Sequence, residues 1–204
     1  MNYYEWLEAD DIDDITPWVL RNLYIDEKED GIGGDGLRKW DLRKGKYIDV
    51  WDPQNLAEYE LDGHRDDFVS TAFYVPVVSP ALKTLLERLT PGEIQFLPLQ
   101  IRKIGGNGEV KGYHIANFLH MVDCIDRKLS KYLEWKPGDS REDLIGKSFR
   151  DMEKIVLKGS SIGNHKIFRL TMWDIVMVVS EEIVVAIEEA GLTGSKFRKL
   201  ETIS

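Results

Sequence analysis

Several side chains that can bind a metal ion lie near the middle of the chain: His114, His120, Asp123, Cys124 and Asp126. If residues 114–120 form one extended strand, the two histidines project from the same face, because side chains alternate along a strand. Two imidazoles with a carboxylate from Asp123 or Asp126 can hold Zn²⁺ and activate water, which would suit a metal-assisted hydrolase. The alternative is a strand with two ordinary polar positions. We favour it because the closely spaced ligand pairs of known metal sites are absent.

Other motifs associated with catalysis are incomplete. Cys124 is the only cysteine, and no catalytic signature surrounds it, so we expect a buried structural thiol. Residues 31–36 match G-x-G-x-x-G, but an acidic stretch precedes them where dinucleotide binding requires a strand. Gly146-Lys147-Ser148 resembles the end of a phosphate-binding loop, yet Arg141 stands where that loop requires glycine. We therefore expect no catalytic residue, no cofactor and no bound metal, and we predict that the protein is not an enzyme.

The acidic residues are concentrated in the first third of the chain. Residues 1–67 contain 19 Asp and Glu against 8 Lys and Arg, whereas residues 68–204 contain 17 against 19. The first third therefore carries the whole acidic excess behind the net charge of −9. Such a surface repels phosphate and attracts basic proteins, although the same residues would also simply keep the protein soluble. We expect a protein partner with a basic face and no nucleic acid.

No segment suits a membrane or export. The longest unbroken apolar runs have five residues, whereas a membrane-spanning helix needs about 20. The N-terminus, Met1–Glu5, lacks the basic and apolar regions of a secretory signal. We expect no membrane association and a cytoplasmic location, with which the single cysteine agrees.

The first 67 residues are expected to wrap around the rest of the fold as an irregular acidic region. Thr16-Pro17 is typical of a helix start and predicts a short helix through Leu20 or Leu23. Residues 26–36 combine charge with glycine and predict a loop. Aromatic side chains would anchor the region, since disordered segments contain few of them. Four of the six tryptophans lie in residues 1–67, and we expect three of them, Trp18, Trp40 and Trp51, to be the anchors.

From residue 68 onward, the hydrophobic pattern predicts an α+β fold with antiparallel strands. Two helices are expected to begin at Ser79 and Ser180, where a serine precedes an apolar helical face. Gly105–Gly108 predicts the turn of a hairpin. We treat residues 1–204 as a single domain. The predicted strands are 73–78, 94–104, 110–118, 149–157, 165–172 and 175–179, and the predicted helices are 79–89 and 180–190.

Two segments, 73–104 and 174–204, share a pattern of strand, serine-started helix, turn and strand. Val77-Val78-Ser79 opens the first helix, and Val178-Val179-Ser180 opens the second. The pattern suggests an internal duplication. The alternative is that serine caps and apolar helix faces recur by chance, because such helix signals are common.

A further series of short pieces runs from residue 51 towards residue 197. In order and spacing, this series resembles a family of bacterial immunity proteins of polymorphic toxin systems. The family is called immunity protein family eleven and was formerly a domain of unknown function. The resemblance leaves the N-terminal fifty residues outside. The pieces are Trp51-Asp52-Pro53, Asp67-Phe68, Val78-Ser79-Pro80 with Leu82, Glu93–Leu99, Tyr113–Asn117, Asp123–Asp126, Ser130, Ile167-Phe168-Arg169, Val178-Val179-Ser180 and Gly191–Gly194.

The resemblance implies a protein that binds and neutralises a cognate toxin domain. Tight inhibition needs a few buried anchors, commonly tryptophan, tyrosine or arginine, and complementary charge speeds capture. We therefore place the partner-binding surface in the acidic third. An adaptor or chaperone for a secreted effector is the other protein-binding alternative, and the oligomeric state stays open. The candidate partner-binding residues are Asp10, Asp11, Asp13, Asp14, Trp18, Asp26, Glu27, Glu29, Asp30 and Trp40.

Overall fold

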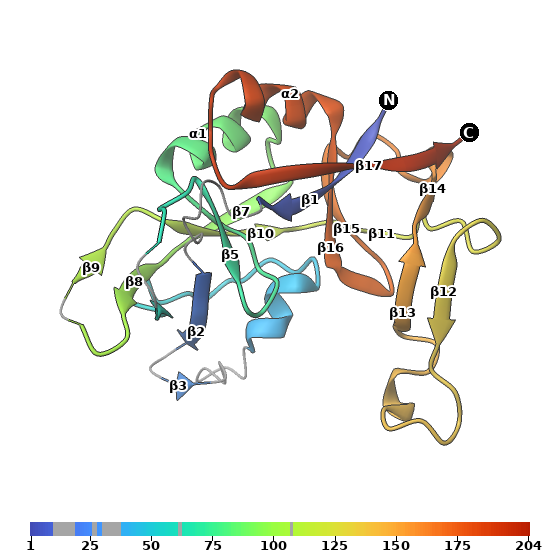
Figure 1. The fold of residues 1–204 in the computed structure, drawn as a ribbon, viewed down its shortest axis with the longest axis horizontal. Helices are drawn as coiled ribbons and strands as arrows, with labels where there is room; N and C mark the ends of the chain where they lie inside the picture. The colour runs from blue at the N-terminus through green and yellow to red at the C-terminus, as the bar shows by residue number, and fades with distance from the viewer. Residues whose placement is uncertain (10–18, 26–27, 30–37, 61–62, 107) are drawn as a thin grey trace.

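The computed structural model describes residues 1–9, 19–25, 28–29, 38–60, 63–106 and 108–204. Over these residues the chain forms strands and two α-helices, which confirms the predicted α+β class (Figure 1). The strands are β1 (Tyr3–Glu8), β2 (Val19–Ile25), β3 (Lys28–Glu29), β4 (Leu56–Tyr59), β5 (Phe68–Thr71), β6 (Val77–Val78), β7 (Ile94–Pro98), β8 (Gln100–Lys103), β9 (Glu109–Val110), β10 (His114–Phe118), β11 (Met121–Val122), β12 (Lys131–Glu134), β13 (Phe149–Lys154), β14 (Val156–Lys158), β15 (Ile167–Leu170), β16 (Trp173–Ser180) and β17 (Ser195–Ile203). The helices are α1 (Pro80–Leu89) and α2 (Glu181–Glu189), with 3₁₀ turns η1 (Lys39–Arg43), η2 (Glu142–Leu144) and η3 (Gly159–Ser161).

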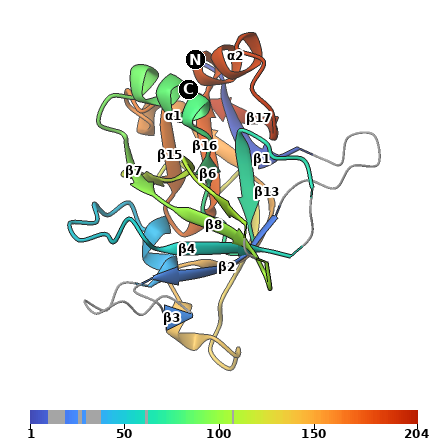
Figure 2. The same ribbon diagram turned by 90° about the vertical axis from the view of Figure 1, so that its left-hand side faces the viewer.

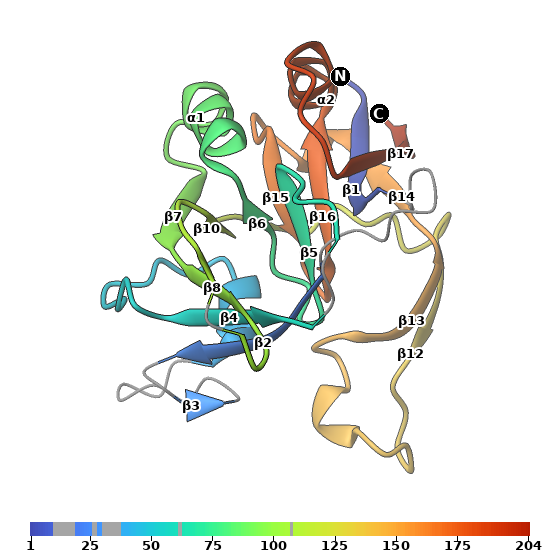
Figure 3. The same cartoon turned by 60° about the vertical axis from the view of Figure 1, so that its left-hand side comes forward.

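The described strands form two large sheets and a separate two-stranded ribbon. One sheet has the order β11-β15-β16-β1-β17-β14. The other has the order β7-β10-β6-β5-β2-β4-β8-β9, and β3 pairs with β2. Most neighbouring strands in both sheets are antiparallel. The ribbon β12–β13 extends away from the body and carries the loop that joins its strands (Figure 3). We call residues 131–154 the arm.

Two strand–helix–strand units have the same arrangement. In the first unit, β6, α1 and β7 follow one another, and β10 lies between the two strands and is antiparallel to both. In the second unit, β16, α2 and β17 enclose β1 in the same way. The two helices contact each other at one end of the molecule (Figures 1 and 3). Both predicted helices are therefore confirmed, while the origin of the two units by duplication stays a prediction.

A hydrophobic cluster lies between the helices and the two sheets, and β1 contributes its centre. Trp6 is almost fully buried, and its ring lies 4.7 Å from that of Phe68 and 6.3 Å from that of Phe118. The Trp6 indole Nε1 donates a 2.9 Å hydrogen bond to Ser195 Oγ. Residues 3–8 are thus a core strand. The sequence instead predicts that they belong to a segment that wraps around the fold. The helix residues that reach this cluster are Leu82, Leu85, Leu86, Ile183, Val184 and Ile187.

The predicted helix through Leu20 or Leu23 is wrong, because residues 19–25 form strand β2. Leu20 and Leu23 are buried in the core, whereas Asn22 and Tyr24 donate hydrogen bonds to the Glu58 carboxylate. Pairing with β4 and β5 therefore outweighs a local helix-start signal, as tertiary contacts commonly do. The start signal itself, Thr16-Pro17, lies outside the described residues.

The predicted strand 73–78 is reduced to the two residues of β6, because a turn occupies the residues before it. The Thr71 hydroxyl donates to the Val75 carbonyl at 2.7 Å and accepts the Val75 N–H at 2.9 Å. Tyr74, in the same turn, has a left-handed backbone with φ of 57°.

The predicted hairpin of 94–118 is confirmed in interrupted form: β7 pairs with β10, and β8 pairs with β9 beyond Leu99.

The two serines that begin the helices differ in their hydrogen bonds. Ser79 Oγ accepts the N–H of Leu82 at 3.2 Å and donates to Asp67 Oδ1 at 2.5 Å. Ser180 occupies the N-cap position of α2, but its hydroxyl makes no cap hydrogen bond within the described part of the chain. Asp67 Oδ2 also accepts the N–H of Thr193 at 3.0 Å. This carboxylate therefore links the start of α1 to the turn that follows α2, and so joins the two units.

Candidate functional site

The candidate metal-binding group that the sequence offers as an alternative is not assembled. His114 Nδ1 lies 3.0 Å from the Gly112 carbonyl, and Asp123 is exposed. The Asp126 carboxylate accepts backbone N–H groups at 2.8 and 3.0 Å from the two residues that follow Arg127. These backbone hydrogen bonds lower the pKa of Asp126 and give it the role of a turn cap. The expected strand ends at Phe118, so His120 does not share a strand face with His114.

Cys124 is a buried structural thiol, as predicted. It is completely buried in the cluster around β15 and β16. Burial, with a smaller contribution from the charge of Asp123, raises the pKa of the thiol to about 12. Because the thiolate is the nucleophilic form, the residue is unreactive at neutral pH.

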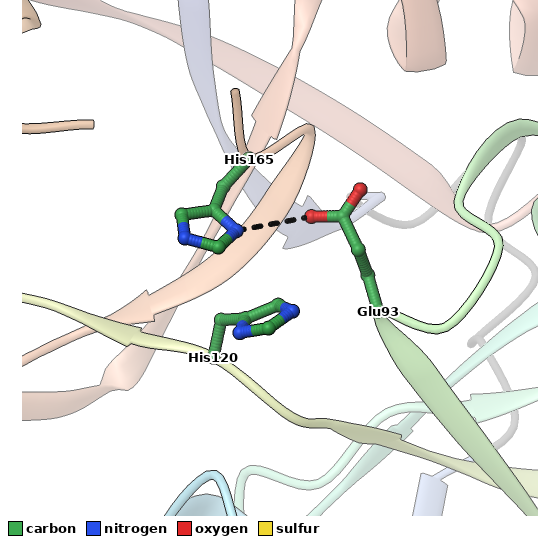
Figure 4. A group of neighbouring side chains, drawn as sticks. All are labelled: Glu93, His120 and His165. Carbon is green, nitrogen blue, oxygen red and sulfur yellow. Dashed lines mark ion pairs between the residues drawn. The ribbon is translucent and has the colours of Figure 1, made fainter. Parts of the chain in front are cut away.

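One residue of this candidate group, His120, instead lies beside Glu93 and His165 (Figure 4). One ligand atom from each of the three side chains lies within 4.8 Å of the others. The His165 Nδ1 to Glu93 Oε2 distance is 3.5 Å, and the centroids of the two imidazole rings are 4.2 Å apart. All three residues are partly buried. We call them the Glu93–His120–His165 cluster.

Each residue of this cluster lies within two residues of a strand end. Glu93 precedes β7, His120 lies between β10 and β11, and His165 lies two residues before β15. Burial first, and the neighbouring His165 second, lower the pKa of His120, so its imidazole is favoured in the neutral form. Imidazole nitrogens and a carboxylate oxygen are suitable metal ligands.

Sequence reasoning found His120 and missed Glu93 and His165. The three residues come from different parts of the chain, and no spacing rule connects them. What unites them is the strand pairing of β7 with β10 and of β11 with β15. Pairings of this kind are set by the tertiary fold rather than by any local motif.

Two of the ten candidate partner-binding residues, Glu29 and Trp40, lie within the described residues. Asp10, Asp11, Asp13, Asp14, Trp18, Asp26, Glu27 and Asp30 lie outside the described residues, as does the G-x-G-x-x-G match at residues 31–36. Glu29 belongs to the short strand β3, which pairs with β2 at the bottom of Figure 2. Trp40 lies in η1, and 43% of it is exposed. These are the two candidate partner-binding residues within the described part of the chain.

The segment around Trp40, residues 38–51, is firmly held against the second sheet. Asn117 on β10 donates a 2.8 Å hydrogen bond to the Lys46 carbonyl. Gln95 on β7 accepts the Ile48 N–H and donates to the Ile48 carbonyl, at 2.9 and 2.8 Å. The Trp51 indole donates to the Pro98 carbonyl at 2.8 Å. This segment is therefore a fixed part of the surface, held by contacts with β7 and β10.

The same segment presents large apolar side chains to solvent. Tyr47 is 64% exposed and Val50 is 69% exposed, while Leu42 is fully buried and anchors η1. The ammonium of Lys39 lies 4.9 Å from the centre of the Trp40 ring. We call Trp40, Tyr47 and Val50 the exposed apolar residues of segment 38–51. The two tryptophans of this segment therefore differ: Trp51 stabilises the scaffold, and Trp40 is exposed to solvent.

Among the described residues, neither α-helix has the length and apolar character needed to cross a membrane.

Comparison with known proteins gives the family of the chain. A search of curated proteins found no match. The family model described as Immunity protein family (Imm11) matches residues 14–202. The match starts before residue 50, so the expectation that the N-terminal fifty residues lie outside the family is wrong. With nearly its whole length covered, the chain belongs to the Imm11 immunity protein family.

Proposed function

We propose that this protein neutralises a cognate toxin domain of a bacterial polymorphic toxin system by direct contact in the cytoplasm, without chemistry of its own. The observation that carries the proposal is the family match over residues 14–202. The burial of Cys124 and the dispersal of the candidate metal group agree with a role that needs a surface rather than a catalytic centre.

The acidic region and segment 38–51 together form the proposed toxin-binding surface. Residues 1–67 hold the acidic excess, and segment 38–51 lies within them. The backbone around Tyr47 and Val50 is held by hydrogen bonds that join their neighbours Lys46, Ile48 and Trp51 to β7 and β10, so little loop ordering opposes binding. Aromatic anchors surrounded by charge are typical of tight protein interfaces. The arm is the contrasting surface, because its residues 131–154 carry equal numbers of acidic and basic side chains.

Charge reversal in the acidic region is expected to slow capture of the toxin. Two variants replace either Asp10, Asp11, Asp13 and Asp14 or Asp26, Glu27, Glu29 and Asp30 with lysine. Each should lower the association rate constant about 10–100-fold at low salt and flatten its salt dependence, because electrostatic steering is lost. The measurement is stopped-flow association with the product of the adjacent toxin gene, disarmed by mutation of its active site.

A control variant carries the same change in charge on exposed carboxylates elsewhere: Glu134, Asp151, Glu188 and Glu189. It should associate at close to the wild-type rate. Equal association rates for all variants would contradict the proposed surface. A stable complex in which the active toxin still kills cells would show an escort rather than an inhibitor.

Trp40→Ala is expected to weaken the complex without destabilising the fold. Removal of a half-exposed indole that the partner covers should raise the dissociation constant about 10–100-fold, mainly through faster dissociation. The matched control is Leu133→Ala on the arm, where the side chain is 57% exposed. Isothermal titration calorimetry with the disarmed toxin compares them. Unchanged affinity for Trp40→Ala would exclude this residue from the interface.

A further inference from the structure

We propose that Glu93, His120 and His165 form a Zn²⁺-binding site that fastens the two sheets together. The chain passes from β10 in one sheet to β11 in the other through Leu119 and His120. Glu93 stands at the edge of the sheet that contains β10, and His165 leads into β15, which pairs with β11. A metal held by the three residues would cross-link these segments where the sheets meet. This site is independent of the proposed toxin-binding function.

The distances are close to those of a bound metal. One atom from each side chain lies within 4.8 Å of the others, and the His165 Nδ1 to Glu93 Oε2 distance is already 3.5 Å. Neighbouring ligands on a tetrahedral zinc ion, with bonds of about 2.0–2.1 Å, lie about 3.3 Å apart. The two imidazole rings face each other at 4.2 Å with an interplanar angle of 37° (Figure 4). Small side-chain rotations would bring all three atoms onto one ion, and water would take the fourth position.

Hydrogen bonds already hold the backbone of the cluster in place. The Glu93 carbonyl accepts the N–H of Leu119 at 2.9 Å, and the His120 carbonyl accepts the N–H of Arg169 at 2.9 Å. The Glu93 carboxylate also accepts the N–H of Lys166 at 3.1 Å. The cluster segments are thus bonded to one another without any metal. Such outer contacts orient metal ligands and strengthen their binding.

The ligand types indicate which metal would bind. Two imidazole nitrogens and one carboxylate oxygen suit Zn²⁺ and disfavour Mg²⁺ and Ca²⁺, which prefer sites made only of oxygen. The carboxylate lowers the net charge of a zinc complex, and neutral histidines add none.

The test uses the full chain with any affinity tag removed and with metal stripped by a chelator. Isothermal titration with Zn²⁺ should show one equivalent bound with a dissociation constant in the micromolar range or tighter. Co²⁺ should give the intense visible absorption of a tetrahedral or five-coordinate site. The melting temperature should rise with Zn²⁺ concentration, because a ligand that binds only the folded state stabilises it.

The chain provides its own control histidines. Glu93→Gln, His120→Ala and His165→Ala should each weaken Zn²⁺ binding beyond the about 10–100-fold that loss of an outer hydrogen-bonding partner costs. His64→Ala and His114→Ala should leave it unchanged, since neither residue lies in the cluster. Glu93→Gln retains the carbonyl that accepts the Lys166 N–H, so its fold should survive. Failure of the wild-type protein to bind zinc, or equal losses in the control variants, would overturn the proposal.

Discussion

Gly194→Ala is expected to lower the free energy of unfolding by about 3–4 kcal/mol. Gly194 has φ of +85°, a conformation in which a side chain is strained by about 1–2 kcal/mol. A Cβ there would also lie 2.2 Å from the Phe68 carbonyl oxygen and 2.5 Å from Asp66 Cβ. Forcing extra atoms into a packed site costs about a further 1–3 kcal/mol. Because the free energy of unfolding of a domain is only about 5–15 kcal/mol, this loss would remove a large part of the stability of the protein.

Backbone hydrogen bonds around Gly194 oppose the movement that would relieve this clash. The Gly194 carbonyl accepts the N–H of Ala9 at 2.9 Å, and the Thr193 carbonyl accepts the N–H of Phe68 at 3.0 Å. Asp67 also binds Thr193 and the cap of α1. A displaced backbone at Gly194 would therefore disturb β1, β5 and the link between the two strand–helix–strand units.

Gly191→Ala is the matched control, because Gly191 lies in the same turn. It also has a left-handed backbone, with φ of +64°, but a Cβ there would meet nothing within 4 Å. Its expected loss is about 1 kcal/mol, from backbone conformation alone. Urea unfolding followed by tryptophan fluorescence measures both variants. Equal losses would show that the close approach of Phe68 and Asp66 is relieved at little cost.

Local signals predict the helices and the interrupted hairpin, because their causes lie within a few residues. Ser79-Pro80 and the apolar face that follows specify α1, and Gly191 ends α2 with a positive φ. The position of β1 between β16 and β17 has no such local cause. It depends on the pairing of Tyr3 with Ser180 and Leu200, residues from the opposite end of the chain. Strand β2 was missed for the same reason.

The candidate site could be predicted only where chemistry follows from residue type alone. The acidic excess of residues 1–67 is visible in the sequence, and so is the single cysteine. The Glu93–His120–His165 cluster is not, because three separate strand ends bring it together. Trp40 and Trp51 look alike in the sequence. The structure distinguishes them, because Trp51 packs against the core and its indole donates a hydrogen bond to the Pro98 carbonyl.

Arg169→Met is the second change with a large expected effect, and we expect it to lower the free energy of unfolding by about 3 kcal/mol. Arg169 is completely buried in β15, and its guanidinium donates to the Asp174 carbonyl at 2.6 Å and to the Tyr74 carbonyl at 3.0 Å. It also lies 5.4 Å from the centre of the Phe118 ring. Burial, with Arg43 nearby, lowers the pKa of Arg169 to about 9, so the group is still charged at neutral pH.

The loss has a specific structural origin, because methionine fills part of the volume but donates no hydrogen bond. Two carbonyls in part-buried hydrogen bonds would lose their charged donor. A hydrogen bond to a charged group contributes about 1.5–3 kcal/mol. Relief from burying a charge offsets part of this loss. The control is Arg150→Met on the arm, where an exposed arginine pairs with Asp139 at 3.2 Å and should contribute less than about 1 kcal/mol. Chemical denaturation measures the free energy of unfolding of both variants. Equal losses would show that the hydrogen bonds from Arg169 to the Asp174 and Tyr74 carbonyls stabilise the fold no more than an exposed ion pair does.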